Sequence, residues 1–487
     1  TVCSTIDGVV RTPTDVDTLK KIQFHQAQLI VLDAISNYFR RYAAFAKEEM
    51  SRYDSQQTKD ELLHMSQICE HLAEEPARDF WEALEFVYMI HVVEFMETNA
   101  QGIALGRTDQ YLYPYYKAAL DNGTYTKDFM QELIEFFYLK LTTHEKLAPD
   151  TGNDQWRGGV RGWTGTALIV GGVGKDGNGA TNDLAFMVLD VHAPTRIVNP
   201  WLAVRMHANT PWELKVKVAN LVRLGTGEPK IFNDDVAIPA LLAHGVDFHE
   251  ARNYQVVGCV EPDVSGKCYG WKDCGHMNVA KVLELALNDG RCLHCGPSCA
   301  RWAKCGAKGE RLGPQTGSLA DMTSFDQVLE AYDKQMKYWC DRQVAVLNAV
   351  DLAHQAVRPL PFLSQLMDGC IEKGKDVTWG GTKYNFTGPQ GVGIGTAADG
   401  LSTVKQLVFD EKKVTGRELL DAVEDNWVGH EPLYAYVNSP KVHHYGNDDD
   451  YADELAQFVM DTWCKHIENR PNAHGGHFLP GAYSVTV

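Results

Sequence analysis

The sequence predicts an α/β protein in which a mostly parallel sheet follows a helical N-terminal flank. In the first 100 residues, apolar side chains recur at intervals of three and four, as in Leu29–Ile35 and Phe80–Ile90, which is the spacing of helices. Beyond residue 150, short apolar runs alternate with longer helical segments, and this alternation indicates parallel strands joined by helices. We therefore expect one domain over residues 1–487, with a helical flank at 1–150 and the sheet within 151–487.

Each expected element follows from a local pattern. Helices are expected wherever apolar residues have helical spacing: 14–100, with Pro76 in the first turn of a later segment, then 127–141, 212–224, 279–288, 320–356 and 415–428. Strands are expected at short β-type runs: 166–172, 201–207, a run from Tyr254 that ends at Cys259, and one inside the glycine-rich connector 377–396. The aromatic segment 106–116 is expected to be a loop.

Composition excludes several classes of protein. The net charge of -18 argues against a nucleic-acid partner, which would need a basic face. No apolar run is long enough to span a bilayer, and the first residues lack the basic and apolar zones of a signal peptide. Twelve cysteines in 487 residues fit a reducing cytoplasm better than a disulfide framework. Because the chain begins at Thr1 and ends inside a strand-like run, we expect it to be part of a longer protein.

The stretch from Tyr254 to Pro262 carries the strongest chemical signal. A β-type run leads to Gly258, Cys259, Val260 and Glu261, and residues two apart in an extended segment point to the same side. Pro262 is expected to end the strand, so the thiol and the carboxylate would lie side by side in a loop.

Three interpretations of Cys259 follow from the residues alone. It is either an inert core cysteine, a nucleophile that uses His276 as its base, or a thiol that becomes a thiyl radical. A thiyl radical abstracts a hydrogen atom from a C–H bond of similar strength, and the neighbouring Glu261 would act as the general base.

Other motifs give weaker signals. The glycine runs 171–174 and 388–395 lack the spacing of phosphate loops, so close backbone packing is the better interpretation. Cys292, Cys295, Cys299 and Cys305, with His294, suggest a zinc or iron–sulfur site, but their spacing matches no paired knuckle. Reduced surface thiols are the simpler interpretation, and no metal ligand is assigned.

Two groups of histidines and acids are given no chemical role. His474 and His477 stand in a glycine turn and could be ligands, but no acidic residue is nearby in sequence, so ordinary surface histidines are the better interpretation. His91, Glu94 and Glu97 share a helix face with apolar residues, which indicates an amphipathic boundary.

The segment Gly258–Pro262 resembles the thiyl-cysteine loop of the glycyl radical enzymes, the pyruvate formate-lyase-like superfamily. The likeness extends along nearly the whole chain, in the order of the family. Further similar stretches are 76–84, 105–116, 225–235, 384–391 and 481–486.

This resemblance implies an incomplete ten-stranded α/β barrel, surrounded by helices, over 151–487. It implies that Cys259 abstracts hydrogen and that Glu261 is the acid/base. The radical would rest on a glycine and be installed by an S-adenosylmethionine-dependent iron–sulfur activase. No stretch of this sequence resembles the family's glycine motif, so we expect the glycine radical domain to lie outside the chain. The chain alone would then hold no bound cofactor and be inactive. A homodimer acting on a small molecule, with no nucleic-acid or membrane partner, is also expected.

The resemblance also narrows the reaction. Pyruvate formate-lyase carries two adjacent cysteines, whereas Cys259 has Gly258 and Val260 as neighbours, which disfavours acyl transfer. Glu261 favours the lyase and dehydratase branch. The residues expected to contact substrate are Ile103, Ala104, Trp163, His276, Tyr483, Ser484 and Val485. Their largely apolar character suggests an arylacetate that is decarboxylated, although such discrimination is weak. Formate acetyltransferase-type acyl transfer, a Cys–His hydrolase or transferase, and a Cys-rich metal-binding protein are the alternatives.

Overall fold

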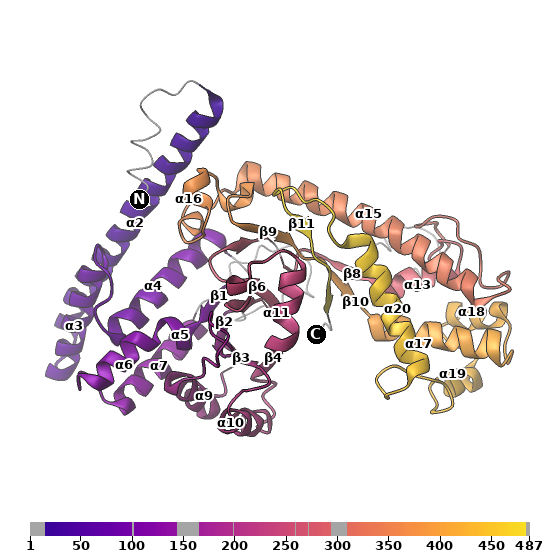
Figure 1. Ribbon diagram of the computed structural model, residues 1–487, viewed down its shortest axis with the longest axis horizontal. Coiled ribbons are helices and arrows are strands. Elements are labelled where there is room, and N and C mark those ends of the chain that lie inside the picture. Colours follow the sequence, from indigo (N-terminus) through magenta and orange to yellow (C-terminus); the bar gives the residue numbers. More distant parts are fainter. Residues whose placement is uncertain are drawn as a thin grey trace. The chain divides into compact units, whose positions relative to one another are not determined.

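The computed structural model describes residues 15–99, 102–143, 165–197, 199–258, 260–270, 272–293 and 309–483. The chain divides into two compact units (Figure 1). The first contains residues 1–269 and 358–384, and the second contains residues 270–357 and 385–487. No helix of the described ranges combines the length and the apolar character needed to cross a bilayer.

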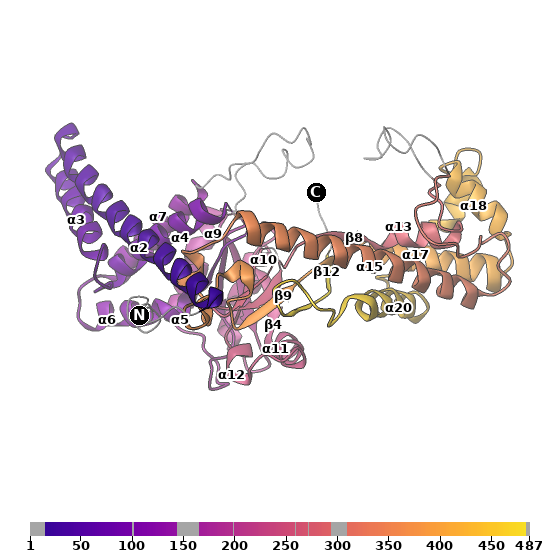
Figure 2. The same ribbon diagram turned by 90° about the horizontal axis from the view of Figure 1, so that it is seen from above.

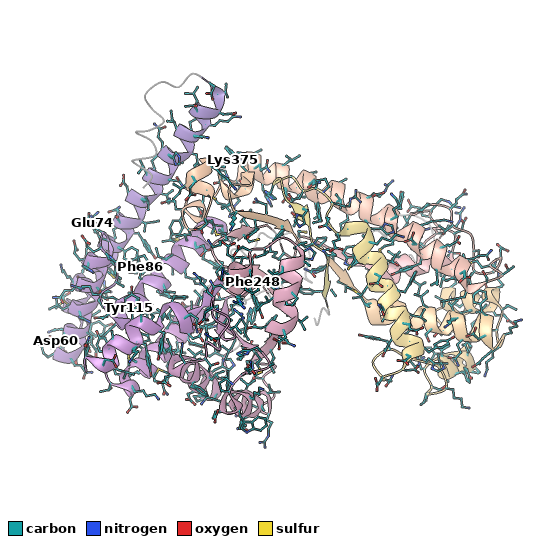
Figure 3. The ribbon with its side chains drawn as sticks, viewed as in Figure 1. Asp60, Glu74, Phe86, Tyr115, Phe248 and Lys375 are labelled. Atoms are coloured by element: carbon teal, nitrogen blue, oxygen red, sulfur yellow. The ribbon has the colours of Figure 1, made fainter. Side chains whose placement is uncertain are left out.

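The first unit begins with two long helices, α2 (Val16–Glu49) and α3 (Gln56–Leu72), which lie side by side (Figures 1 and 2). Arg40 of α2 pairs with Glu74, which lies just beyond α3 and is labelled in Figure 3. The next helix, α4 (Phe80–Thr98), starts where the Asp79 side chain accepts a hydrogen bond from the N–H of Glu82. Pro76 therefore precedes the helix, and its expected place in the first turn is wrong, because the carboxylate of Asp79 provides the N-cap.

A four-stranded parallel sheet forms the centre of the first unit. Its order is β1 (Ala104–Arg107), β2 (Ala167–Gly171), β3 (Trp201–Met206) and β4 (Lys230–Asn233). Helices cover one face of the sheet, among them α7 (Lys127–Thr142), α9 (Asp183–Thr195) and α10 (Trp212–Val222). Their core includes Leu168, Val170, Leu202 and Val204. Because side chains alternate along a strand, Ile169 and Arg205 lie on the opposite face.

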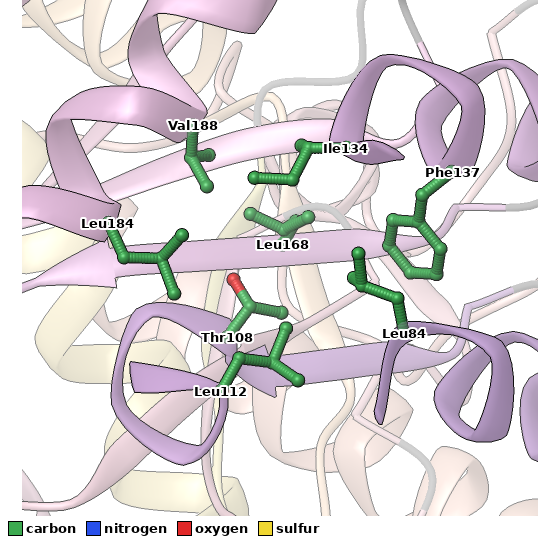
Figure 4. A pocket seen from close by; sticks show the side chains of 8 residues that line it. All are labelled: Leu84, Thr108, Leu112, Ile134, Phe137, Leu168, Leu184 and Val188. Carbon is green, nitrogen blue, oxygen red and sulfur yellow. The ribbon is translucent and has the colours of Figure 1, made fainter. Parts of the chain in front are cut away.

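A small apolar cavity lies on the helix-covered face (Figure 4). Figure 4 shows Leu168 of β2 at its centre, with side chains from α4, α7 and α9 around it. Its lining consists of Leu84, Thr108, Leu112, Ile134, Phe137, Leu168, Leu184 and Val188. The cavity is a packing gap in the core and lies on the other side of the sheet from Arg205.

The aromatic segment 106–116 is not a loop, so that expectation is wrong. It contains the end of β1 and two short helices, α5 (Thr108–Tyr111) and α6 (Tyr113–Asp121). Pro114 lies in the first turn of α6, where the missing N–H is tolerated. Leu112 and Tyr116 are buried in the helical core, so tertiary burial fixes a structure that the local composition did not indicate.

Shorter elements complete the first unit. They are α11 (Asp234–Ala243), α12 (Phe248–Ala251), β5 (Tyr254–Val257), β6 (Glu261–Val264), β7 (Cys268–Tyr269) and α16 (Cys370–Lys373).

The second unit contains two sets of short parallel strands. One set has the order β12 (Gly481–Tyr483), β10 (Gln390–Val392) and β8 (His276–Asn278). The other pairs β11 (His477–Phe478) with β9 (Tyr384–Thr387). The connector 377–396 therefore contains two strands, β9 and β10, where one was expected.

Helices of the second unit pack around a single core. They are α13 (Val279–Leu287), α15 (Phe325–Val357), α17 (Ile394–Val404), α18 (Gly416–Glu424), α19 (Glu431–Val437) and α20 (Asp450–Ile467). α15 runs along α13 and α20 (Figure 2). The helices expected at 127–141, 212–224, 279–288, 320–356 and 415–428 are confirmed within a few residues.

Candidate active site

The segment expected to hold the reactive thiol is a β-hairpin. β5 pairs with β6 in antiparallel register, with Tyr254 opposite Val264 and Val257 opposite Glu261. The expectation that Pro262 ends the strand is wrong, because Pro262 lies inside β6 opposite Val256. A two-stranded hairpin leaves edge positions where no ladder N–H is required, so proline is tolerated.

Glu261 folds back over the turn of the hairpin. Its side chain is 7% exposed, and its Oε2 accepts a hydrogen bond of 2.8 Å from the N–H of Val260. Gly258 has a φ of +63°, and a Cβ at this position would lie 2.7 Å from Oε2 of Glu261. The glycine therefore provides both the left-handed backbone and the space for the carboxylate. Cys259 falls between these residues and lies outside the described part of the chain.

A second glycine, Gly102, packs against the same turn. A Cβ on Gly102 would lie 2.8 Å from Cα of Gly258, so the two backbones are in direct contact. Ile103 follows and is buried, and Ala104 begins β1 and is half-buried. The structure thus places these two candidate substrate residues on the segment that touches the turn. Gly102 was not among the residues predicted from the sequence, although a glycine beside a strand is a signal of close backbone approach.

His276 and Tyr483 come together in the second unit. Their rings stack with centroids 5.8 Å apart and an interplanar angle of 30°. His276 Nε2 lies 2.8 Å from Oδ1 of Asp273. His276 opens β8, and Asn278 caps the helix that follows, because its side chain accepts a hydrogen bond from the N–H of Lys281. Trp163, Ser484 and Val485 lie outside the described residues.

The cysteine cluster is described only at Cys292. Its side chain is 3% exposed and its Sγ lies 3.1 Å from Nζ of Lys281, so the expectation of a surface thiol is wrong for this residue. Cys295, Cys299 and Cys305 lie outside the described ranges, as does His294. Within those ranges, no group of three or more His, Cys, Asp or Glu side chains is arranged to hold a metal.

The glycine turn at 474–477 is not a surface feature. His474 is 5% exposed, and its Nε2 lies 3.1 Å from Oδ2 of Asp351 in α15. The expectation of an ordinary surface histidine is therefore wrong. The acidic partner is remote in the sequence, which is why the sequence pattern did not show it.

The acids on α4 also have specific partners instead of marking an amphipathic boundary. The carboxylate of Glu97 accepts hydrogen bonds of 2.8 Å from the N–H groups of Phe362 and Leu363. His91 is buried, with its Nε2 3.3 Å from the Thr166 hydroxyl. Burial, with a smaller contribution from the Glu97 charge, raises the pKa of Glu94 to about 7.

Comparisons with known proteins agree with this architecture. A model of the pyruvate formate lyase-like family matches residues 6–487. Over 467 residues the chain is 46% identical to (2S)-3-sulfopropanediol dehydratase from Klebsiella oxytoca, which covers 96% of this chain and 55% of that protein.

Two solved structures share the fold. The glycerol-bound form of the B12-independent glycerol dehydratase from Clostridium butyricum matches with a TM-score of 0.89 at 34% identity, covering 98% of this chain and 58% of that one. A glycyl radical enzyme from Archaeoglobus fulgidus matches with a TM-score of 0.88 at 31% identity, and the match covers 99% of this chain and 59% of that one. The expected α/β barrel fold of glycyl radical enzymes is thereby confirmed. The chain spans little more than half the length of these relatives, and it belongs to the pyruvate formate lyase-like family.

Proposed function

We propose that this chain carries the catalytic hairpin of a glycyl-radical dehydratase that removes water from a small vicinal diol. The observation that carries the proposal is the buried carboxylate of Glu261, which the Val260 N–H holds over the turn that includes Cys259 in the sequence. The 46% identity to a sulfopropanediol dehydratase supports a diol with a sulfonate group as the first substrate to test. An arylacetate, which the apolar Ile103 and Ala104 suggested, is the second candidate.

The chemistry requires only two groups of this chain. A thiyl radical on Cys259 takes a hydrogen atom from the carbon that bears one hydroxyl. Glu261 takes the proton of that hydroxyl, and the neighbouring C–O bond breaks. The leaving oxygen receives the proton and departs as water, and the product radical regains a hydrogen atom from Cys259. The net change is diol to carbonyl compound plus water. A glycyl radical, installed by an S-adenosylmethionine-dependent iron–sulfur activase, would generate the thiyl radical.

The test uses protein produced from the whole reading frame and activated without oxygen. Sulfopropanediol, propane-1,2-diol, glycerol, hydroxyproline and 4-hydroxyphenylacetate are offered in parallel. For Glu261→Gln we expect a wild-type glycyl radical signal by electron spin resonance, with dehydration lowered by about a hundredfold or more. Glu213→Gln, on the exposed first turn of α10, is the matched control and should keep full activity.

Full dehydration by Glu261→Gln would rule out its role as acid/base. Turnover of the arylacetate in place of every diol would overturn the dehydratase assignment.

A further inference from the structure

Two buried arginines reach toward the base of the catalytic hairpin from neighbouring strands. Arg107 ends β1 and pairs with Ile169 of β2, whereas Arg205 of β3 pairs with Gly171 of β2. Ile169 and Gly171 are two residues apart on one strand, so both arginines project from the same face. That face is opposite to the one on which α7, α9 and α10 pack.

Arg205 binds the backbone at the start of β5. Its side chain is fully buried, and it donates hydrogen bonds of 2.8 Å to the carbonyl of Tyr254 and 2.9 Å to the carbonyl of Arg252. The guanidinium also lies 3.8 Å from the centre of the Tyr254 ring. A planar guanidinium that binds two carbonyls and stacks on an aromatic ring fixes both the position and the orientation of the backbone that it binds.

Arg107 holds the residue between these two carbonyls. It is 4% exposed and donates 3.1 Å to the side-chain oxygen of Asn253 and 2.9 Å to the carbonyl of Gly171. Burial, together with the nearby charge of Arg205, lowers the pKa of Arg107 to about 10, so the side chain is charged at neutral pH. The two arginines thus bind three consecutive residues, 252–254.

Asp234 sets the position of Arg205. Its carboxylate oxygens lie 2.8 Å from Nε and 2.9 Å from Nη2 of Arg205, and one of them accepts 2.8 Å from the N–H of Val173. A Cβ on Gly172 would lie 2.7 Å from Nε of Arg205. This contact explains the glycine run that follows β2: the glycines let the backbone pack against the ion pair.

A buried ion-pair cluster of this kind contributes little to the net free energy of folding. Desolvating paired charges costs about as much as their attraction returns, so apolar residues of similar volume often serve stability as well. A two-stranded hairpin, in contrast, is only marginally stable by itself. The specific gain from two buried arginines is therefore a fixed position for the hairpin.

We propose that Arg205 and Arg107 are positioning residues that hold the hairpin so that Glu261 meets the substrate at reacting distance. This inference rests on the proposed function. A shift at Tyr254 is transmitted along the hydrogen-bonded ladder to Glu261, which lies opposite Val257. Neither arginine touches the reacting atoms, so their effect is on geometry.

The test compares Arg205→Lys and Arg107→Lys, which keep the charge but lose the planar guanidinium. Amide hydrogen exchange, followed by mass spectrometry, should accelerate in peptides covering residues 254–264 and stay at the wild-type rate in residues 212–222 of α10. In activated protein, kcat should fall by about a hundredfold, the cost of a displacement near 1 Å, with the glycyl radical signal retained and KM unchanged. Arg470→Lys, at a partly exposed pair with Asp341, is the control and should match the wild type in every readout.

Unchanged exchange over residues 254–264 overturns the proposal, and so does acceleration of equal size throughout the first unit, which marks a general loss of stability. If Arg205→Lys does not fold, Arg107→Lys decides the question alone. If the wild type converts no diol, the proposed dehydration fails. The exchange measurement needs no substrate, so it still decides whether the arginines fix the hairpin.

Discussion

Nε2 of His474 lies 3.1 Å from Oδ2 of Asp351, and both side chains are buried. This contact joins the turn before β11 to the last two turns of the long helix α15. In a low-dielectric interior, a carboxylate and an imidazole stabilise each other only while both are present.

Removal of one partner should therefore be costly. We expect Asp351→Asn to lower the free energy of unfolding by about 2–4 kcal/mol, because it leaves a buried histidine with a weaker partner. Asp341→Asn is the control on the same helix, since Asp341 pairs with Arg470 at a partly exposed position and should cost about 1 kcal/mol or less. Urea unfolding followed by fluorescence measures both. Equal losses of unfolding free energy in the two variants would show that the buried pair stabilises the protein no more than the partly exposed pair does.

Glu228 should make stability depend on pH. Burial raises its pKa to about 7, although the Leu202 N–H donates to its Oε2 at 2.7 Å. An unfolded glutamate titrates near about 4.3, so the folded state binds more protons between these values. Stability attributable to this group is therefore present at low pH and is lost as pH rises toward 7. Burial lowers the pKa of the nearby His192, so this neighbour is neutral at pH 7 and above and does not offset the loss there.

Glu228→Gln stays neutral and keeps the acceptor oxygen for Leu202. We expect this variant to be more stable than the wild type at pH 8 by about 1–3 kcal/mol and to be equal to it at pH 4. Urea midpoints at the two pH values measure the difference. A difference in urea midpoint between Glu228→Gln and the wild type that is the same at both pH values would contradict the prediction.

Gly102 should control the position of the turn between β5 and β6. In Gly102→Ala the new Cβ would start 2.8 Å from Cα of Gly258, so one backbone segment must move. We expect turnover to fall by about tenfold to a hundredfold, with little change in the melting temperature. Gly395→Ala, which meets only the Tyr445 ring at 3.4 Å, is the control and should retain activity. Wild-type turnover in Gly102→Ala would show that the turn tolerates displacement.

Trp463 should anchor the strand that ends at Tyr483. Its fully buried indole N–H donates 3.1 Å to the carbonyl of Gly481 in β12. We expect Trp463→Phe to destabilise the protein by about 2–3 kcal/mol, because it removes this bond and leaves a cavity. Trp212→Phe replaces a side chain that is 72% exposed and should cost about 0.5 kcal/mol or less. Thermal melting compares the two variants. Equal falls in melting temperature would contradict the idea that Trp463 anchors β12.

The helices were predictable because their signal is local. The segment 320–356 has apolar residues at helical spacing, and α15 occupies Phe325–Val357. The strands that run into the helices α9 and α10 were likewise visible as short aliphatic runs. The resemblance of residues 258–262 to a thiyl-cysteine loop identified the family correctly.

What sequence could not provide was contact between distant segments. Glu97 is bonded to the N–H of Phe362, and His474 lies against Asp351, and neither pair is close in the sequence. The aromatic segment after Gly106 folds into helices because Tyr116 is buried against other helices. Pro262 was misinterpreted because local rules for proline do not distinguish a central strand from a two-stranded hairpin.

The hairpin form of residues 254–264 has a consequence for how this scaffold diversifies. A hairpin brings the chain back to its starting side, with Tyr254 opposite Val264, so the tip is exchangeable while the base stays fixed. Because the β5–β6 ladder and the two buried arginines hold the base, we expect substitutions at the tip to leave the rest of the first unit unchanged.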